Sequence, residues 1–200
     1  MAKIPDCHGI WLFQQIETKA IGPKLARIAD APGLLFLFWF SSMAQTALAD
    51  TSAAAASYIS QQQCARQWRG FLHALGAEFV SALAPEDLHT LMARVGTRFA
   101  SEQAPGPCQT LEELQQAMSR IWMELDWGYV LLTQHAEHLK ITHHYSPLVA
   151  AFGREHAAWS SGFLQGVYQR WFDAAGSEGL RVVLTAPADA WGSAVFHLSR

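Results

Sequence analysis

The sequence predicts an α+β domain in which N-terminal helices, a hairpin, a further helix and a second hairpin give one small antiparallel sheet packed against helices. Three observations support this prediction: three successive segments with helical spacing of apolar residues, two pairs of short alternating segments, and a broad apolar helix between those pairs. Short strands joined in pairs favour antiparallel pairing. One sheet covered by helices is therefore expected.

The first two expected helices meet at a joint formed by Ala84 and Pro85. Before the joint, apolar residues recur on one helical face: Trp68, Phe71, Leu72, Leu75, Phe79 and Leu83. Pro85 suits the first turn of a second helix, which should extend to about Ala100. Its inward residues are expected to be Leu88, Leu91, Met92, Val95 and Phe99. Gly96 lies in mid-helix at a cost of about 1 kcal/mol relative to Ala, which indicates that another element approaches the backbone there.

A third helix should begin at Leu111. Thr110 and Glu113 form a Ser/Thr-x-x-Glu capping box, in which each side chain satisfies a free backbone N–H at the helix start. The expected buried face is Leu111, Leu114, Met118, Ile121, Trp122 and Leu125. Gly128 then ends the helical pattern, and a strand is expected over residues 129–133.

The second half of the chain predicts three more strands and one helix. Residues 134–137 should form a turn, and Leu139, Ile141 and His143 then alternate with polar residues in a second strand. Residues 145–154 are expected to be a loop. A helix ending near Gly176 carries a broad apolar face: Trp159, Phe163, Leu164, Val167, Trp171 and Phe172. Leu180, Val182 and Leu184 alternate in a third strand, and residues 191–198 should supply the fourth.

Composition indicates a globular protein without a nucleic-acid partner. Half of the 200 residues are hydrophobic, 16% are charged, and the net charge is −3. No basic cluster is present to neutralise phosphates. The three cysteines, Cys7, Cys64 and Cys108, are few and far apart, which favours a reducing compartment over a disulfide framework.

Residues 1–60 are an unassigned extension, and residues 61–200 are expected to form a single domain. The run LLFLFWF at residues 34–40 is too short to cross a bilayer, and Ala47-Leu48-Ala49 follows it in the manner of a signal-peptide cleavage site. The preceding region mixes basic with acidic residues and is long for a signal peptide. Three interpretations remain open: an export signal, an appended membrane-touching helix, and a start codon assigned too far upstream.

The sequence favours neither a metal site nor a catalytic site. Four histidines surround the first hairpin, namely His135, His138, His143 and His144, but adjacent residues in a strand point to opposite faces. No Gly-x-Ser-x-Gly motif or Gly-rich phosphate loop is present. The candidate glycosidase carboxylates, Glu86, Asp87, Glu112, Glu113, Glu124 and Asp126, lie mainly at helix starts. No cofactor is expected.

Eight tryptophans are present, and most are expected in the core. Trp68, Trp122, Trp159 and Trp171 fall on apolar helix faces. Trp127 and Trp191 are expected at strand starts, where an interface role is open because aromatic residues are enriched between subunits. Trp11 and Trp39 belong to the unassigned extension.

The combination of several motifs resembles the family of the bacterial cellulose synthase D subunit. The motifs are Pro107-Cys108-Gln109-Thr110, then a helix, then Trp127-Gly128, with Arg94-Val-Gly-Thr-Arg98 upstream and Leu164-Gln-Gly-Val-Tyr-Gln-Arg-Trp171 downstream. The resemblance extends from about Trp68 to the end of the chain. The residues that carry it are expected to be structural: Gly96, Pro107, Cys108, Gln109, Thr110, Trp127, Gly128, Gly166, Tyr168 and Trp171.

The resemblance implies a non-catalytic accessory subunit of the bacterial cellulose synthase complex. It implies a homo-octamer, built as a tetramer of dimers, that associates with other synthase subunits and guides nascent β-1,4-glucan chains for crystallisation into fibrils. It also implies a cytoplasmic place beside the inner-membrane complex, whereas the signal-like segment leaves a periplasmic one open. The family's glucan passages involve its N-terminal part, where this chain departs, so no glucan-contacting residue is assigned.

A second interpretation uses the same order of elements. Vinyl-reductase-type ligand-binding domains and the vesicle-tethering subunits that share their fold are similar in this respect. That resemblance implies a sensory or tethering module with a buried pocket for a small apolar molecule.

Overall fold

Helices precede the first strand in the computed structural model, which describes residues 52, 54–59 and 62–200. They are α2 (Arg66–Ala82), α3 (Pro85–Glu102) and α4 (Leu111–Glu124), and residues 54–59 are also helical. The expectations for residues 34–40 and 47–49, and for Cys7, Trp11 and Trp39, lie outside the described residues. The described residues fall within one compact unit, and the boundary at residue 60 stays a prediction.

The rest of the chain alternates hairpins with helices. The first hairpin is β1 (Tyr129–Gln134) and β2 (Leu139–His144), and the second is β3 (Arg181–Ala186) and β4 (Ala194–Ser199). Between them lie α5 (Leu148–Phe152), the 3₁₀ turn η1 (Arg154–His156), α6 (Ala157–Ser160) and α7 (Gly162–Ala174). This confirms the α+β prediction.

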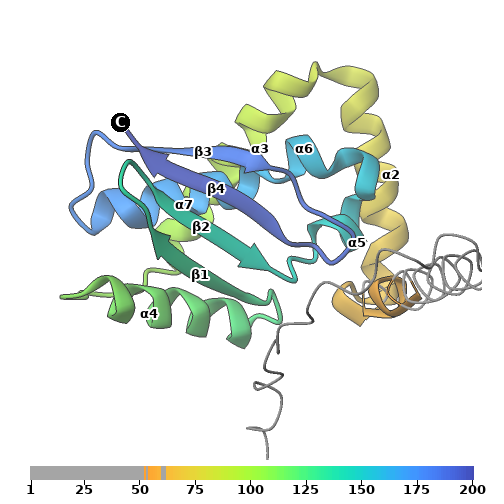
Figure 1. The fold of residues 1–200 in the computed structure, drawn as a ribbon. Coiled ribbons are helices and arrows are strands. Elements are labelled where there is room, and N and C mark those ends of the chain that lie inside the picture. The colour runs from red at the N-terminus through yellow and green to blue at the C-terminus, as the bar shows by residue number, and fades with distance from the viewer. Residues whose placement is uncertain (1–51, 53, 60–61) are drawn as a thin grey trace, which may run out of the picture. The chain divides into compact units, whose positions relative to one another are not determined.

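The four strands form one antiparallel sheet in the order β1-β2-β4-β3 (Figure 1). The hairpins join through β2 and β4, where Ile141 is the partner of Phe196. Both side chains are fully buried. β1 and β3 are therefore the two edges of the sheet.

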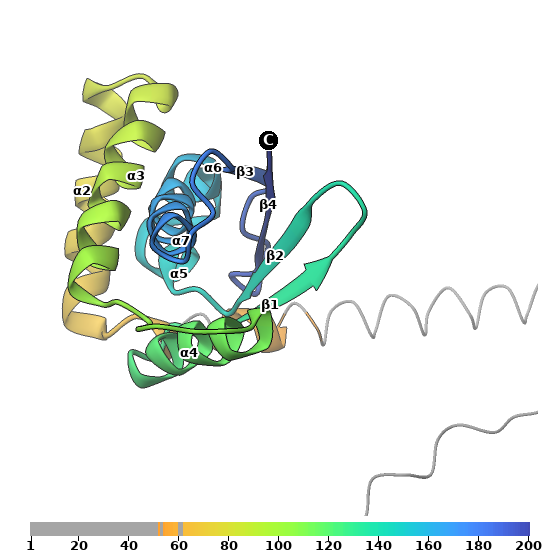
Figure 2. The ribbon, with the colours of Figure 1, turned by 90° about the vertical axis from the view of Figure 1, so that its left-hand side faces the viewer.

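The helices form layers on one face of this sheet. In Figure 2, α7 lies between the sheet and the pair α2 and α3. Glycines allow α3 and α7 to pack closely: a Cβ atom added at Gly96 would lie 2.0 Å from the carbonyl oxygen of Phe163, and one added at Gly166 would lie 2.0 Å from that of Ala93. The approach expected at Gly96 is confirmed.

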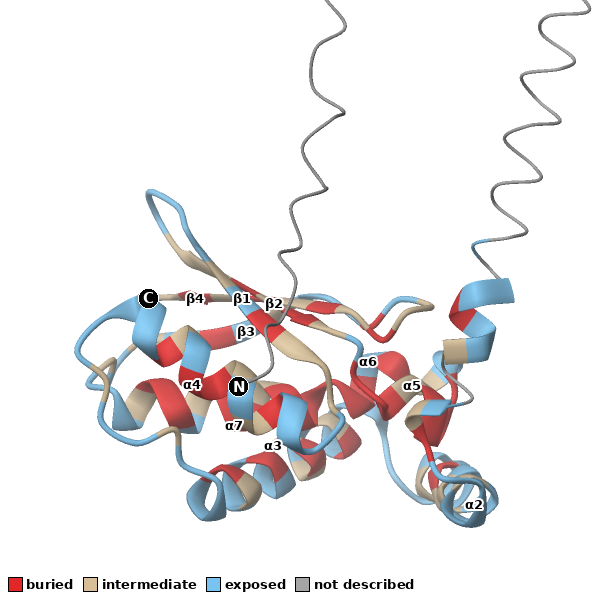
Figure 3. Cartoon of the chain, turned by 90° about the horizontal axis from the view of Figure 1, so that it is seen from below, coloured by how far each residue is buried: buried red, intermediate tan, exposed pale blue. Residues whose placement is uncertain are grey.

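Large aromatic side chains fill the space between α7, α4 and the sheet. The side chains of Trp122, Tyr168, Trp171, Phe172 and Phe196 are almost completely buried. Figure 3 shows α7 largely in the colour of buried residues, whereas much of α2 is exposed. Among the described residues, no helix combines the length and the apolar character that crossing a membrane requires.

The structure corrects several expectations about burial. The apolar face of α2 is only partly covered, because Trp68 and Phe71 are 56% and 57% exposed. The expectation that Trp68 lies in the core is therefore wrong. Val95, Leu111 and Leu125, which are also expected on buried faces, are exposed at the margins of α3 and α4.

Three local assignments also differ from the prediction. The segment expected to be a loop contains α5 and η1, and the small and apolar residues of α5 pack against α2. The broad apolar helix is interrupted at Ser161, which separates α6 from α7. Trp191 lies in a turn before β4 rather than in the strand, because the carboxylate of Asp189 accepts hydrogen bonds from the N–H groups of Trp191 and Ser193 and stabilises that turn.

Candidate functional site

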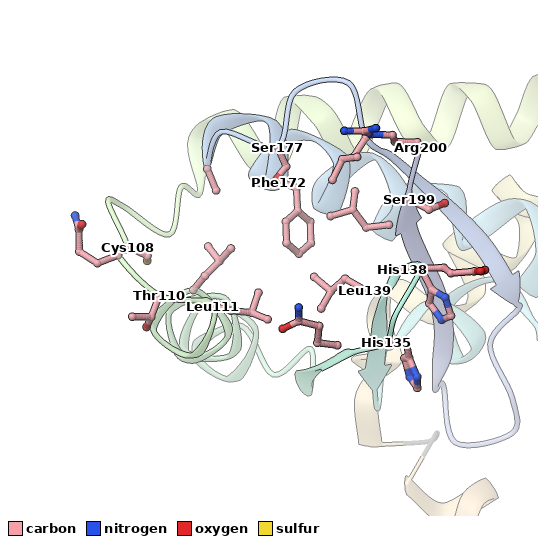
Figure 4. A pocket seen from close by; sticks show the side chains of 17 residues that line it. Cys108, Thr110, Leu111, His135, His138, Leu139, Phe172, Ser177, Ser199 and Arg200 are labelled. Carbon is pink, nitrogen blue, oxygen red and sulfur yellow. The ribbon is translucent and has the colours of Figure 1, made fainter.

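The loop that carries Pro107 to Thr110 borders a surface cleft of about 590 Å³ (Figure 4). The start of α4, the turn between β1 and β2, the end of α7 with the chain that follows it, and the end of β4 surround it. Side chains from these four segments line one space in Figure 4, among them Leu111, His135, Phe172 and Arg200. The cleft thus joins segments that are far apart in the sequence.

Two hydrogen bonds fix the loop to the start of α4. The Thr110 hydroxyl accepts a hydrogen bond of 3.1 Å from the Glu113 N–H, as the capping box predicts. The Glu113 carboxylate accepts one of 2.7 Å from the N–H of Gln109 rather than that of Thr110. The cap therefore extends one residue further into the loop than predicted and holds Gln109 at the edge of the cleft.

The cleft combines an apolar floor with a polar rim. Leucine and phenylalanine side chains supply the floor: Leu111, Leu114, Leu139, Phe172, Leu180 and Leu198. Amide, hydroxyl, imidazole, carboxylate and guanidinium groups also line the cleft: Gln109, Thr110, Gln134, His135, Glu137, His138, Ser177, Ser199 and Arg200. Such a surface can pack against an apolar face of a ligand while donating hydrogen bonds to its edges.

The Cys108 thiol at this cleft has no base beside it in the described part of the chain. Its Sγ lies 3.7 Å from the carbonyl oxygen of Gly106, which can accept a hydrogen bond but cannot activate a thiol. A nucleophilic thiol needs a neighbouring group that favours the thiolate. Among the described residues, the hydrogen bond of this thiol is therefore to a backbone carbonyl.

Three imidazoles stack beside the cleft on the first hairpin and β4. Ring centroids are 4.8 Å apart for His135 and His138, and 3.9 Å apart for His138 and His197. The pKa of His197 is lowered by partial burial and by the nearby His138, His135 and Lys140. Residues 52, 54–59 and 62–200 contain no group of three or more side chains placed to hold a metal ion.

His143 and His144 point to opposite faces of β2, as the alternation predicts. His143 is fully buried, with Nδ1 2.6 Å from the Tyr168 hydroxyl and Nε2 2.9 Å from the carbonyl oxygen of Trp127. A carbonyl oxygen can only accept, so Nε2 carries the proton and Nδ1 accepts from Tyr168. Burial lowers the pKa of His143 to about 3, so the ring is neutral. Sequence reasoning missed this pair, and only the inward register of His143 pointed to it.

The residues behind the family resemblance occupy three places in the structure. Gly96 and Gly166 lie where α3 meets α7. Trp127 and Tyr168 form hydrogen bonds with the His143 ring, Gly128 lies against the backbone of His144, and the Trp127 ring stacks on Trp122 with centroids 5.7 Å apart. Trp171 donates a hydrogen bond of 2.7 Å from Nε1 to the carbonyl oxygen of Gln103. This bond connects the C-terminal end of α3, which precedes the loop of Pro107 to Thr110, to α7. Pro107, Cys108, Gln109 and Thr110 form the loop itself.

Gly128 satisfies a backbone requirement between α4 and β1. Its φ is +83°, and an added Cβ would lie 1.8 Å from the carbonyl oxygen of His144. A side chain there would meet both an unfavourable backbone conformation and a steric clash. The glycine therefore does more than end the helix, because it lets β1 start directly beside the end of β2.

Comparison with known proteins agrees with the resemblance. The family model for the cellulose synthase D subunit matches residues 54–197. A protein of Komagataeibacter xylinus named cellulose synthase operon protein D is 32% identical over 103 residues, which are 50% of this chain and 66% of that protein. The protein of the same name from Komagataeibacter sucrofermentans matches with the same values. Another from K. xylinus is 30% identical over 122 residues, or 60% of this chain and 78% of that protein.

The chain thus covers a little less than two thirds of the length of the first two relatives. The family match, however, includes α2 to α7, β1 to β3 and most of β4. It also includes all ten residues behind the resemblance. The chain belongs to the cellulose synthase D-subunit family.

Proposed function

We propose that this protein is a non-catalytic accessory subunit of a bacterial cellulose synthase complex. The observation that carries the proposal is the family match over residues 54–197. The names of the relatives, cellulose synthase operon protein D, connect them with the cellulose synthase operon.

The finer part of the proposal is that copies of this chain assemble, as an octamer, and align nascent β-1,4-glucan chains for export and crystallisation. The exposed aromatic residues of α2 support assembly. Trp68 and Phe71 pack edge to face, with centroids 6.1 Å apart, yet each is more than half exposed. Covering such an exposed aromatic pair with a second protein surface lowers the free energy of the system. In a closed symmetric assembly, the aromatic pair of every copy can be covered by another copy.

The proposed location is the cytoplasmic side of the inner membrane, beside the synthase and its other subunits. Guiding glucan chains would follow from assembly, because passages between copies exist only in the oligomer. The alternative small-ligand module gains no support from the core, since Trp122, Tyr168 and Trp171 fill the space between α4, α7 and the sheet.

The decisive experiment is size-exclusion chromatography with light scattering on the full chain. A closed symmetric assembly of about eight copies is expected at micromolar concentration. A monomer or a simple dimer would contradict the octamer. Restoration of ordered fibrils by this gene, in a cellulose-producing strain that lacks its own member of this family, would test the cellulose role separately. Purified protein should show no turnover of UDP-glucose or cello-oligosaccharides.

A further inference from the structure

The two edges of the sheet are treated differently by the helices beside them (Figure 1). At β1, the N–H and carbonyl groups of Val130 bond to the hydroxyl of Ser119 at 3.2 and 3.0 Å. The N–H of Leu132 bonds to the Gln115 side chain at 2.6 Å. Side chains of α4 therefore occupy the outward-facing backbone of β1, and this edge is closed to another strand.

The edge at β3 is closed only at its beginning. Gln169 of α7 accepts a hydrogen bond of 2.8 Å from the N–H of Val182 and donates one of 3.0 Å to the carbonyl oxygen of Leu180. Because Val182 turns its N–H away from β4, the alternation turns the N–H and carbonyl of Leu184 outward as well, and Leu184 is the last such position before the β3–β4 register shifts between Leu184 and Ala186. Within the described residues, no side chain bonds to these two groups of Leu184.

Gln165 of α7 does not form hydrogen bonds with the outward N–H and carbonyl groups of Leu184. It lies one helical turn before Gln169 and lines the same groove as Leu184. Its side chain makes no hydrogen bond to a described residue. The helix thus closes one outward position of β3 and leaves the next one available.

A groove of about 960 Å³ lies at this open position. Val183 and Leu184 of β3 form one wall, and Val80 and Leu83, at the joint between α2 and α3, form another. Val183 is 51% exposed and Val80 is 46% exposed. The groove therefore offers apolar contacts beside a strand edge with unpaired backbone groups.

The charge of the groove is acidic. Glu86 and Glu155 line it, together with His89 and His156, and no Lys or Arg side chain does so among the described residues. Basic side chains on an incoming segment would complement the two carboxylates. Their contribution should weaken as salt concentration rises.

We propose that the open edge of β3 accepts an extended segment of a partner protein as a fifth strand of the sheet. The residues of this segment that face the helices, which are every second residue along it, include both β-branched or other apolar residues and Lys or Arg. Its backbone pairs with Leu184, and its helix-facing side chains enter the groove, where the apolar ones contact Val80 and Leu83 and the basic ones approach Glu86 and Glu155. Strand addition derives affinity from main-chain hydrogen bonds and specificity from alternate side chains. The proposal does not depend on a role in cellulose synthesis.

The test uses the full chain and a synthetic ten-residue peptide whose one face carries Val and Lys in turn at every second position and whose other face carries Thr, with fluorescence anisotropy and amide hydrogen exchange as readouts. Exchange at Leu184 should be fast in the free protein and slow by about tenfold or more with peptide, as one added hydrogen bond implies. Leu184→Pro should abolish binding, and Leu184→Ala, which also shortens the side chain but keeps the N–H, should retain it. The double variant Glu86→Gln and Glu155→Gln should bind more weakly and with less dependence on salt.

A second probe keeps the test informative if Leu184→Pro fails to fold. The same peptide with alternate backbone N-methyl groups keeps its side chains but cannot form the strand ladder, and it should not bind wild-type protein. Equal binding of the methylated and unmodified peptides would overturn the proposal. So would a Leu184 amide that is already protected in the free protein, since either Gln165 or a second copy would then occupy the edge.

Discussion

The hydroxyl of Tyr168 donates a hydrogen bond of 2.6 Å to Nδ1 of His143, between two side chains with no exposed surface. This bond joins α7 to β2. The opposite nitrogen of the same ring donates to Trp127, just before β1. One imidazole therefore links three segments, and its two nitrogens are both satisfied in the middle of an aromatic core.

Tyr168→Phe should destabilise the protein. The substitution leaves Nδ1 of His143 buried without a donor, at an expected cost of about 1–3 kcal/mol in the free energy of unfolding. Urea denaturation followed by tryptophan fluorescence measures this change. Tyr129→Phe is the matched control, because that side chain is only partly buried at the start of β1. An equal and small effect of both substitutions would contradict the role assigned to the buried bond.

Stability should fall as pH falls below about 6.5. The pKa of His143 is about 3 in the folded protein and 6.5 in the unfolded chain. Between these values the unfolded chain binds a proton that the native protein does not, so the free energy of unfolding decreases by up to about 1.4 kcal/mol per pH unit from this group alone. Burial lowers the pKa of the partly exposed His144 as well, which acts in the same direction.

The pH dependence can be assigned to His143 by substitution. His143→Gln removes the titrating group, so the slope of stability between about pH 6.5 and 4.5 should decrease by about one bound proton. Urea denaturation across this range gives the slope even if the variant is less stable overall. An unchanged slope would mean that other groups cause the acid sensitivity.

Two glycine substitutions should have opposite effects. In Gly166→Ala the new Cβ would lie 2.0 Å from the backbone oxygen of Ala93, so α3 and α7 must move apart at a cost of about 1–3 kcal/mol. Gly70 lies in α2 with nothing within 4 Å of its added Cβ. Gly70→Ala should therefore stabilise the protein by about 0.5–1 kcal/mol through helix propensity. Thermal melting of both variants checks the difference, and similar melting temperatures would argue against the close packing of the helices.

Features determined by neighbouring residues could be predicted from the sequence, whereas features determined by distant partners could not. The cap at Thr110 depends only on Glu113, three residues away. Gly96 in mid-helix predicts a close contact with another element, but the sequence does not identify Phe163 as the residue in contact. The periodicity of α2 predicts which side of the helix carries the apolar residues, including Trp68. It does not predict whether another element covers that side. Helix α5 was missed because five residues are too few for a periodic signal.

The candidate site was predictable only in part for the same reason. The sequence predicts that Pro107 to Thr110 form one loop before a capped helix. The alternation in β2 predicts that His143 points inward and His144 outward. The cleft beside the loop depends on Phe172 and Arg200, which come from later segments, and the partner of His143 lies 25 residues away on α7. Side-chain pairing across such distances follows from the packing of whole elements, which spacing along the chain does not determine.

The double substitution Trp68→Ser and Phe71→Ser should disrupt assembly without unfolding the protein. Both side chains are more than half exposed, so removing them should change the stability of the isolated protomer by no more than about 1 kcal/mol, mainly through their contact with each other. If the α2 face joins copies, the same change removes the aromatic surface that holds them together, and truncation of such residues typically costs about 2 kcal/mol or more in binding. Light scattering should then show a smaller species with an unchanged circular dichroism spectrum.

Met123→Ser on α4, where the side chain is 58% exposed, is the control for loss of an exposed apolar group and should leave the assembly intact. An assembly of unchanged mass in the α2 variant would show that another surface joins the copies.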